Sequence, residues 1–455
     1  MLRVLSTVFT LSLACLSAAQ PNILHIHADD HRPDGLAALG NRVLKTPNLD
    51  TLVARGMVFS HCYTQGSMVG AVCQPSRTML LSGHSWQRLP IVKGAKGAQT
   101  LTKGWDASMS LPKVLSAAGY ETWHCGKSGN EFTAALKAFD TNLSMNDPGE
   151  ERRGSSQCHA DAAIDFLSQR HKDRPFYIYL APPVPHDPRI TAPEFTGFYK
   201  PESIPLPAAF MPQHPFDNGE MIVRDELLSP FPRTPGDTKQ QLADYYDCIT
   251  GLDHHVGRIL KLLKESGELE NTLVIFSGDN GLSLGEHGLF GKQNLYEFGG
   301  MHVPLVIAGP GIPKGHTDAL AYLMDLFPTF CEFGGAKVPA GVEGRSLQPI
   351  IQGKQEKVRD VLYTGYRNCQ RAVRDQRWKL IRYPLVNKTQ LFDLQADPHE
   401  LANLADQPEH AAKVKEMMAV LADQMQQYGD THPLTVDHPA PAEWSPPANL
   451  PKAKE

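Results

Sequence analysis

The chain places acidic and amide side chains directly after two apolar segments. Asp29-Asp30 follows ILHIHA, and Asp279-Asn280 follows LVIFSG. We expect both segments to be strands of one open α/β sheet, in which ligands bind beyond the carboxyl ends of the strands. Three carboxylates and one amide oxygen then meet at one edge, where their mutual repulsion requires a cation. Oxygen ligands favour Ca²⁺ or Mg²⁺, although each pair taken alone is more typical of a turn.

A second group of reactive side chains lies in the segment CQPSRTMLLSG, which runs from Cys73 to Gly83. Its combination of Cys, Pro, Ser and Arg at fixed offsets is rare by chance in a chain of this length. Further along stand Gly126-Lys127, Pro185-His186-Asp187-Pro188 and Gly291-Lys292-Gln293. Taken singly, these lysines are typical of a solvated surface and the histidine of a loop, so their significance depends on the whole series.

The segment Cys73-Gln74-Pro75-Ser76-Arg77 resembles the signature of the sulfatase family, in which the cysteine is oxidised to formylglycine. The two acidic pairs, the two Gly-Lys motifs and the histidine loop match the family in order and spacing. The segment from Leu391 to Leu404 resembles the family's C-terminal motif. The resemblance runs from about Asn22 to Leu404. Within the family, which belongs to the alkaline phosphatase superfamily, the chain is similar to bacterial polysaccharide sulfatases.

The resemblance implies an enzyme that hydrolyses sulfate monoesters. Attack on sulfur develops negative charge on the sulfate oxygens and on the leaving alkoxide, so the reaction needs fixed cations and a proton donor. The implied metal is Ca²⁺ rather than Mg²⁺, with the ligands Asp29, Asp30, Cys73, Asp279 and Asn280. The implied catalytic residues are Cys73, Arg77, Lys127, His186 and Lys292, with His186 as the acid. A formylglycine-generating or maturase enzyme is the implied partner.

Two positions depart from the family pattern. Gly129 stands where the family has a histidine two residues after the central lysine, and that histidine is thought to help deprotonate the second hydroxyl of the hydrated aldehyde. Its absence leaves open which base acts in the second half of the reaction. The segment from Glu297 to Pro304 is one residue longer than the usual form and carries His302 where arginine is common.

We expect the substrate to be a sulfated carbohydrate, because the loop from Tyr199 to Glu226 resembles polysaccharide sulfatases. Side chains that could contact the sugar are His31, Arg32, His84, Trp86, Arg88, Arg189 and His302. The sugar, the sulfated carbon and the choice between chain-end and internal attack stay open.

Two alternative functions also stay open. A phosphodiester or phosphonate hydrolase of the same superfamily could share the metal residues and even the formylglycine. A non-catalytic, metal-bound glycan-binding homologue would fit the departure at Gly129. Relative activity on sulfate and phosphodiester substrates distinguishes the first alternative, and glycan binding without turnover would indicate the second.

The elements that position these side chains follow an α/β pattern. Short apolar runs alternate with helical periodicity, which predicts a large mixed, mainly parallel sheet sandwiched by helices, of the alkaline phosphatase-like type that the resemblance implies. We expect strands at 23–28, 176–180, 273–276 and 303–307, and helices at 111–118 and 245–265. A hairpin at 371–383, a strand at 390–394 and a helix at 410–428 predict a smaller C-terminal α+β subdomain.

The expected organisation is a signal peptide over 1–19, a catalytic domain over 20–355, the subdomain over 356–430 and a loose Pro/Ala-rich tail over 431–455. Arg3 precedes an apolar run that is too short to span a membrane and ends in the small residues Ser17-Ala18-Ala19. We therefore expect an exported protein, periplasmic or secreted. Lipidation at Cys15 is less favoured, because Ser12 stands where an aliphatic residue is expected.

Composition narrows the functional class. The net charge of −5 offers no basic surplus for nucleic acid. Hydrophobic residues at 41% and charged residues at 20% suit a globular protein with a large core. The eight cysteines include no CxxC pair, which argues against a cysteine zinc site. Disulfide pattern and oligomeric state stay open, and no stretch of the mature chain is long and apolar enough to span a membrane.

Overall fold

The fold is built on one large sheet. The computed structural model describes residues 20–89, 91–93, 99–101, 106–127, 132–145 and 156–450. Within these residues, nine strands form a sheet in the order β10-β2-β11-β9-β1-β8-β6-β7, with β12 paired to β2. Their bounds are β1 Asn22–Ala28, β2 Met57–Tyr63, β6 Glu121–Lys127, β7 Thr141–Met145, β8 Phe176–Ala181, β9 Thr272–Gly278, β10 His302–Val303, β11 Leu305–Ala308 and β12 Gly315–Tyr322.

The strands that carry the acidic pairs lie at the centre of this sheet. β1 pairs in parallel with β8 on one side and with β9 on the other. All residues of these three strands are buried, as expected for strands covered on both faces. β10 and β11 run antiparallel to their neighbours. The sheet is thus mixed and mainly parallel, which confirms the predicted fold class.

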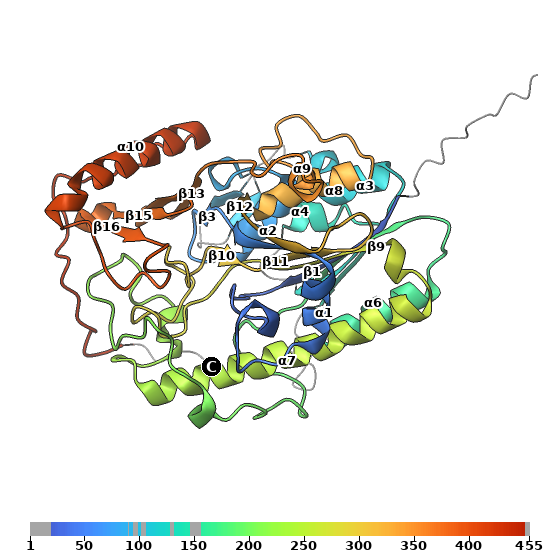
Figure 1. The fold of residues 1–455 in the computed structure, drawn as a ribbon, viewed down its shortest axis with the longest axis horizontal. Coiled ribbons are helices and arrows are strands. Elements are labelled where there is room, and N and C mark those ends of the chain that lie inside the picture. The colour runs from blue at the N-terminus through green and yellow to red at the C-terminus, as the bar shows by residue number, and fades with distance from the viewer. Residues whose placement is uncertain are drawn as a thin grey trace, which may run out of the picture.

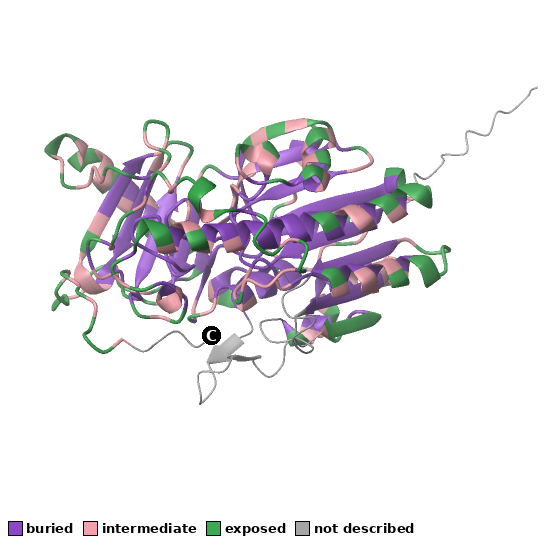
Figure 2. Ribbon diagram, turned by 90° about the horizontal axis from the view of Figure 1, so that it is seen from below, coloured by how far each residue is buried: buried purple, intermediate pink, exposed green. Residues whose placement is uncertain are grey.

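Two layers of helices cover the sheet (Figure 1). One layer packs on Leu24, Ile26 and their neighbours and contains α1 Pro47–Arg55, α6 Gln157–Gln169 and α7 Pro235–Glu265. The other layer packs on Ile23, Tyr177 and their neighbours and contains α2 Cys73–Ser82, α3 Leu111–Ala117, α4 Thr133–Leu136, α8 Leu326–Phe333 and α9 Gln348–Ile351. Figure 2 shows buried residues along the strands and exposed residues on the outer helix turns.

Helix α7 begins ten residues before the predicted helix. Thr234 lies in the extended region, and its hydroxyl accepts a hydrogen bond from the backbone N–H of Asp237. Pro235 follows at the first helical position, where its missing N–H costs nothing. The helix therefore begins before its apolar periodicity does, because the capping residues fix its start at Pro235.

The C-terminal part forms a second sheet in the order β16-β15-β14-β13-β3. The bounds are β3 Gly66–Ser67, β13 Leu362–Tyr366, β14 Gln370–Arg374, β15 Trp378–Tyr383 and β16 Lys388–Asp393, with helix α10 Ala411–Tyr428 packed on the sheet (Figure 1). The predicted hairpin corresponds to β14 and β15. β3 comes from the N-terminal part and pairs in parallel with β13, so the two parts of the chain share this sheet. A small hairpin of β4 Ile91–Lys93 and β5 Gln99–Leu101 lies apart.

A buried charge cluster joins the two parts behind the loop that carries Lys292. The carboxylate of Glu297 lies 2.9 Å from both Arg374 Nη1 and Lys379 Nζ. Its backbone N–H donates to Glu400 at 2.6 Å. Although burial opposes ionisation, Lys379 and Arg374 hold the pKa of Glu297 well below its usual range. The subdomain therefore helps to position the 292–301 loop.

The chain after α10 is bound to the rest of the protein as far as it is described. The carbonyl of Leu434 accepts from Arg382 Nε at 2.7 Å, and the indole of Trp444 packs against Phe231. The expectation of a loose tail is thus wrong for residues 431–450, because its backbone carbonyls and its aromatic ring find partners. The predicted signal peptide, 1–19, lies outside the described residues. Within the described part of the chain, no helix has the length and apolarity that crossing a membrane requires.

Candidate active site

The two acidic pairs meet at the carboxyl edge of β1 and β9. Ala28 pairs with Gly278, so the residues after each strand emerge side by side. The backbone N–H of Asp30 donates to Asp279 Oδ1 at 3.0 Å. Asp30 takes a left-handed φ of 61°, which turns the chain sharply after Asp29. The three carboxylates are at most 1% exposed, so like charges are concentrated in a medium that screens them poorly.

Asn280 completes an oxygen-rich group. Its Nδ2 donates to Asp30 Oδ1 at 2.7 Å, while its buried Oδ1 has no hydrogen-bond partner among the described residues. Burial and the charge of Asp29 raise the pKa of Asp279 to about 6. An unsatisfied amide oxygen beside three carboxylates is a donor set that a hard divalent cation fits.

Cys73 lies against this group at the start of α2. Its Sγ is 3.7 Å from Asp30 Oδ1 and 3.2 Å from Lys292 Nζ. The Ser76 hydroxyl donates to the Asp279 carbonyl and fixes α2 to the end of β9. Burial, followed by the charge of Asp29, raises the pKa of the Cys73 thiol well above its usual range. The unmodified thiol is therefore neutral and a weak nucleophile.

Two buried cations balance most of the negative charge. Arg77 Nε donates to Asp279 Oδ2 at 2.9 Å, and its Nη2 lies 3.5 Å from Asp29 Oδ2. Lys292 Nζ lies 2.6 Å and 2.9 Å from the two carboxylate oxygens of Asp30. Burial disfavours its charge, yet Asp30 raises the pKa of Lys292 well above its usual range. Among the described side chains of this group, three carboxylates face two cations, which leaves one net negative charge that a bound cation would neutralise.

His186 lies at the open side of the group. Its Nε2 is 3.8 Å from Asp30 Oδ2, and the side chain is 13% exposed. Possible ligand atoms of Asp29, Asp30, Cys73 and His186 all lie within 4.8 Å of one another. Nδ1 bonds the carbonyl of Asp187, which can only accept, so Nδ1 carries the proton. The other ring nitrogen, Nε2, consequently faces the reacting groups.

Lys127 is the last residue of β6, which pairs in parallel with β8. The main chain of Lys127 therefore ends at the same sheet edge as Asp29, while its side chain lies outside the described residues. Gly129 also lies outside them, so the departure from the family histidine stays a sequence observation.

Three of the expected sugar contacts are held by the protein's own residues. His31 is fully buried, with its ring edge-on to Phe276 in the interior. The Arg32 guanidinium is 4% exposed and is held by Asp34 and Glu286, both at 2.8 Å. His302 stacks on Tyr63, and its Nε2 bonds the Ser60 carbonyl at 2.9 Å. His31 thus serves internal packing, while Arg32 and His302 are held by neighbouring side chains and backbone, which the sequence could not distinguish from a surface position.

Arg189 lies nearer to the centre. Its guanidinium packs over the Tyr245 ring at 5.7 Å and bonds Gln241, both residues of α7. Burial lowers the pKa of Arg189, and Asp30 is among the charges that oppose this shift. The Tyr245 hydroxyl in turn donates to the Asp30 carbonyl at 2.7 Å. Arg189 thus lies next to the site, and its role as a sugar contact stays a prediction.

Sequence reasoning missed a polar group beside His186. Arg224 pairs with Asp187 and with Asp225, and its side chain is 51% exposed. Asp225 Oδ2 accepts from Gln293 Nε2 at 2.7 Å. Burial opposes ionisation of Asp225, but Lys292 lowers its pKa. Most of these residues come from a proline-rich loop that has no periodicity. Only Gln293 could have been found from the sequence, because it follows Lys292 in the Gly-Lys motif.

Comparisons with known proteins agree with this geometry. The Sulfatase family model matches residues 21–336, and the model "N-sulphoglucosamine sulphohydrolase, C-terminal" matches residues 285–427. An N-acetylglucosamine-6-O-sulfatase of Bacteroides thetaiotaomicron is 27% identical over 91% of this chain and 88% of its own length.

Two solved structures share the fold. One, in complex with its substrate D-glucosamine-2-N,6-O-disulfate, has a TM-score of 0.74 at 24% identity and covers 91% of this chain and 99% of its own. A phosphonate monoester hydrolase from Silicibacter pomeroyi has a TM-score of 0.73 at 21% identity and covers 91% of this chain and 96% of its own. Because one family model spans more than half of the residues, the chain belongs to the sulfatase family, the hydrolases of sulfuric esters.

Proposed function

We propose that this enzyme removes sulfate from a sulfated saccharide with a nucleophile generated at Cys73 and one bound Ca²⁺. The observation that carries the proposal is the convergence of Cys73, three carboxylates, Lys292 and His186 in one buried group with an open side. A neutral thiol is a weak nucleophile towards a sulfate ester. Converted to a formylglycine hydrate, position 73 would supply a hydroxyl for attack on sulfur.

The donors at the edge of β1 and β9 support calcium. The ligand atoms offered here are all oxygens, from the carboxylates of Asp29, Asp30 and Asp279 and from the amide of Asn280. The buried amide oxygen has no hydrogen-bond partner among the described residues. Proteins bind Ca²⁺ and Mg²⁺ through several oxygen ligands of this kind. We favour Ca²⁺ because it accepts more ligands and a less regular geometry than Mg²⁺. The oxygen at position 73 would be a further ligand.

The remaining residues have distinct roles in this proposal. Arg77 and Lys127 would hold the modified side chain at position 73. Lys292 would neutralise charge on the sulfate oxygens, because its ammonium group lies 3.2 Å from Cys73 Sγ. His186 would act as the acid in its imidazolium form, in which Nδ1 donates to the Asp187 carbonyl and Nε2 carries the proton that passes to the leaving alkoxide.

Relatives support a saccharide substrate. The relative from Bacteroides is a sulfatase of N-acetylglucosamine, and another, from Formosa agariphila, is described as an ulvan-active sulfatase. The half-exposed Arg224 beside His186 offers a cation for a further anionic group of a sugar. We also propose export through residues 1–19 and maturation by a formylglycine-generating or maturase enzyme, on the sequence patterns of the N-terminus and Cys73.

The test combines mass spectrometry with sulfate release. Made with a competent modifying system, the tryptic peptide Gly56–Arg77 should lose one sulfur and two hydrogens and gain one oxygen at Cys73. The protein should then release sulfate from at least one member of a panel of sulfated monosaccharides. An active protein with an unmodified thiol would refute the proposed nucleophile. Cleavage of a phosphonate monoester faster than of any sulfated sugar would favour a phosphonate hydrolase. Binding of a glycan without turnover would favour a non-catalytic glycan-binding protein.

A further inference from the structure

Arg224 lies between the segments that carry two of the catalytic candidates. His186 follows β8 and Lys292 follows β9, so the two residues belong to separate loops at the carboxyl edge of the sheet. The Arg224 guanidinium pairs through Nη2 with Asp187 and through Nη1 with Asp225 Oδ1, the latter at 2.7 Å. Each partner leads to one of the two loops. The arginine therefore connects them from the solvent side, with 51% of its side chain exposed.

On one side the connection runs to His186. Asp187 Oδ1 lies 3.5 Å from His186 Nδ1, and Oδ2 of the same carboxylate pairs with Arg224. The same ring nitrogen also bonds the Asp187 carbonyl. The orientation of the imidazole, and with it the direction of Nε2, therefore depends on where Asp187 is held.

On the other side the connection runs through Gln293 to Lys292. Asp225 Oδ2 accepts from Gln293 Nε2 at 2.7 Å, and Gln293 Oε1 accepts from the backbone N–H of Lys292 at 3.0 Å. Gln293 Nε2 also donates to the Gly70 carbonyl at 3.2 Å, in the loop that leads to Cys73. One amide thus joins Asp225 to the segments of Lys292 and Cys73.

The chain after Arg224 is anchored to the loop that carries Lys292. Glu226 is buried, and its Oε2 accepts from the backbone N–H of Phe290 at 2.9 Å. Phe290 precedes Lys292 by two residues. The segment of Arg224 is therefore fixed on this side, and its guanidinium extends the connection to Asp187.

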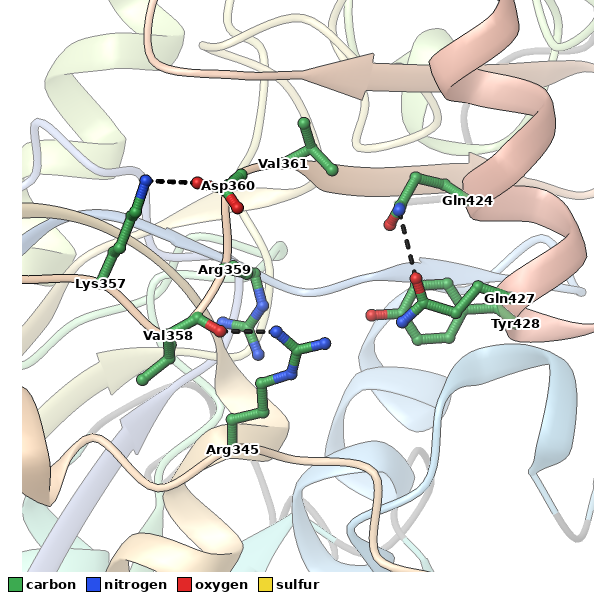
Figure 3. Close-up of a pocket in the computed structure, with 9 residues that line it drawn as sticks. All are labelled: Arg345, Lys357, Val358, Arg359, Asp360, Val361, Gln424, Gln427 and Tyr428. Carbon is green, nitrogen blue, oxygen red and sulfur yellow. Dashed lines mark hydrogen bonds and ion pairs between the residues drawn. The ribbon is translucent and has the colours of Figure 1, made fainter.

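Two exposed cations in the cleft beside the end of α10 are bound differently (Figure 3). Lys357 pairs with Asp360 at 2.5 Å, and Arg345 bonds the Val358 carbonyl. Both bonds stay within one segment, residues 345–360. Arg224 instead bridges two loops that follow different strands, so its loss would affect how those loops are placed.

We propose that Arg224 is a positioning residue, which holds the acid His186 and the cation Lys292 at the spacing that the reaction requires. Without its positive charge, Asp187 and Asp225 would repel each other across the gap between the two loops. A displacement of about 1 Å can lower the rate about 100-fold. The inference rests on the proposed function, because it assumes the roles given there to His186 and Lys292.

The test is Arg224→Met, with Arg377→Met as the matched control. Arg377 is 52% exposed and pairs with Asp393, which is 10% exposed, against 51% for Arg224 and 11% for Asp187. Exposed ion pairs add little stability, so both variants should unfold at about the wild-type temperature. With the sulfated monosaccharide that the wild type cleaves fastest, we expect Arg224→Met to lower kcat about 10- to 100-fold. Arg377→Met should keep the wild-type kcat.

The division of the effect between kcat and KM separates positioning from contact with the sugar. A contact made equally in the bound substrate and in the transition state changes KM, whereas misplaced catalytic groups change kcat. A loss of kcat of less than about threefold in Arg224→Met would overturn the inference, whatever happens to KM. Sulfate release by the wild type would stand in that case, whereas failure of the proposed function would appear as no release from any sulfated sugar.

Hydrogen exchange tests the connection without any substrate. Backbone amides of residues 182–190 and 286–296 should exchange faster in Arg224→Met than in the wild type, because the bridge between the two loops is lost. Arg377→Met should leave the exchange of both segments unchanged. Equal exchange of both segments in the wild type and Arg224→Met would overturn the inference, even if no sulfated sugar were turned over.

Discussion

Lys292 and Asp30 form a buried ion pair. Replacing one partner tests whether this pair stabilises the cluster of three carboxylates. Lys292 is 3% exposed and Asp30 is 1% exposed, with 2.6 Å between Nζ and Oδ1. Lys292→Met keeps the approximate length of the side chain but leaves three carboxylates facing Arg77 as the remaining cation among the described side chains. Removing one partner of a buried ion pair costs about 3–5 kcal/mol, because the other charge stays desolvated. We expect this loss of unfolding free energy in the presence of a chelator.

The double variant isolates the pairwise contribution. Asp30→Asn removes the negative charge that Lys292→Met would leave unpaired. The double variant Asp30→Asn/Lys292→Met should therefore lose about 1–3 kcal/mol less unfolding free energy than the two single variants lose in sum. Calcium should reduce the loss caused by Lys292→Met alone, because the ion replaces a missing positive charge. The same variant should lose a factor of about 10²–10³ in kcat, since Lys292 faces the developing negative charge.

Urea unfolding of the four proteins, with chelator and with calcium, measures these quantities. Additive losses in chelator would show that the two side chains do not interact as a pair. An identical cost of Lys292→Met with and without calcium would show that no ion binds beside these carboxylates. Either result would refute the charge balance described for the site.

Four further predictions concern single residues. Cys73→Ala should abolish turnover while lowering the unfolding free energy by only about 1 kcal/mol, since it removes a single sulfur; a loss of folding, seen by circular dichroism, would contradict this. Asp279→Ala should remove both calcium and activity, and stoichiometric calcium retained in elemental analysis would mean that the ligands are misassigned. Burial raises the pKa of Asp253 to about 6, so the folded chain keeps this proton longer than the unfolded chain, and the contribution of Asp253 to stability should fall by about 3 kcal/mol as the pH rises from about 4 to above 6. Asp253→Asn should lack that fall, and parallel pH profiles of the two proteins in urea would refute the assignment. If the position of Gly129 lacks a needed base, rapid mixing should show a burst of released alcohol before a slower steady rate, and Gly129→His should speed the slow phase; a linear trace from modified, active enzyme would rule this out.

Several parts of the site followed from local sequence alone. The Asp29-Asp30 and Asp279-Asn280 pairs follow apolar runs that are buried strands, and parallel neighbours bring their carboxyl ends together. Cys73 was identified by the fixed offsets of its motif, which also carries Ser76 and Arg77. These inferences succeeded because each depends on a short segment and on one general rule about where α/β sheets bind ligands.

Other contacts depend on pairings that no local pattern records. Gly66-Ser67 has no strand periodicity, yet it pairs with β13 and brings Arg367 beside the loop to Cys73. His31 and His302 are polar residues near important motifs, and only packing against Phe276 and Tyr63 shows that they face inward. Arg224 joins the site through ion pairs formed by a proline-rich loop.

The sequence by itself determined the family, the class of chemistry and the main catalytic candidates, because these depend on residue types at fixed spacing. The tertiary structure decided which polar side chains border the catalytic centre and how the charges of the described residues balance. The physical reason is that hydrophobic periodicity reports which side of a segment is buried, whereas the partner it is buried against is chosen by packing over the whole chain.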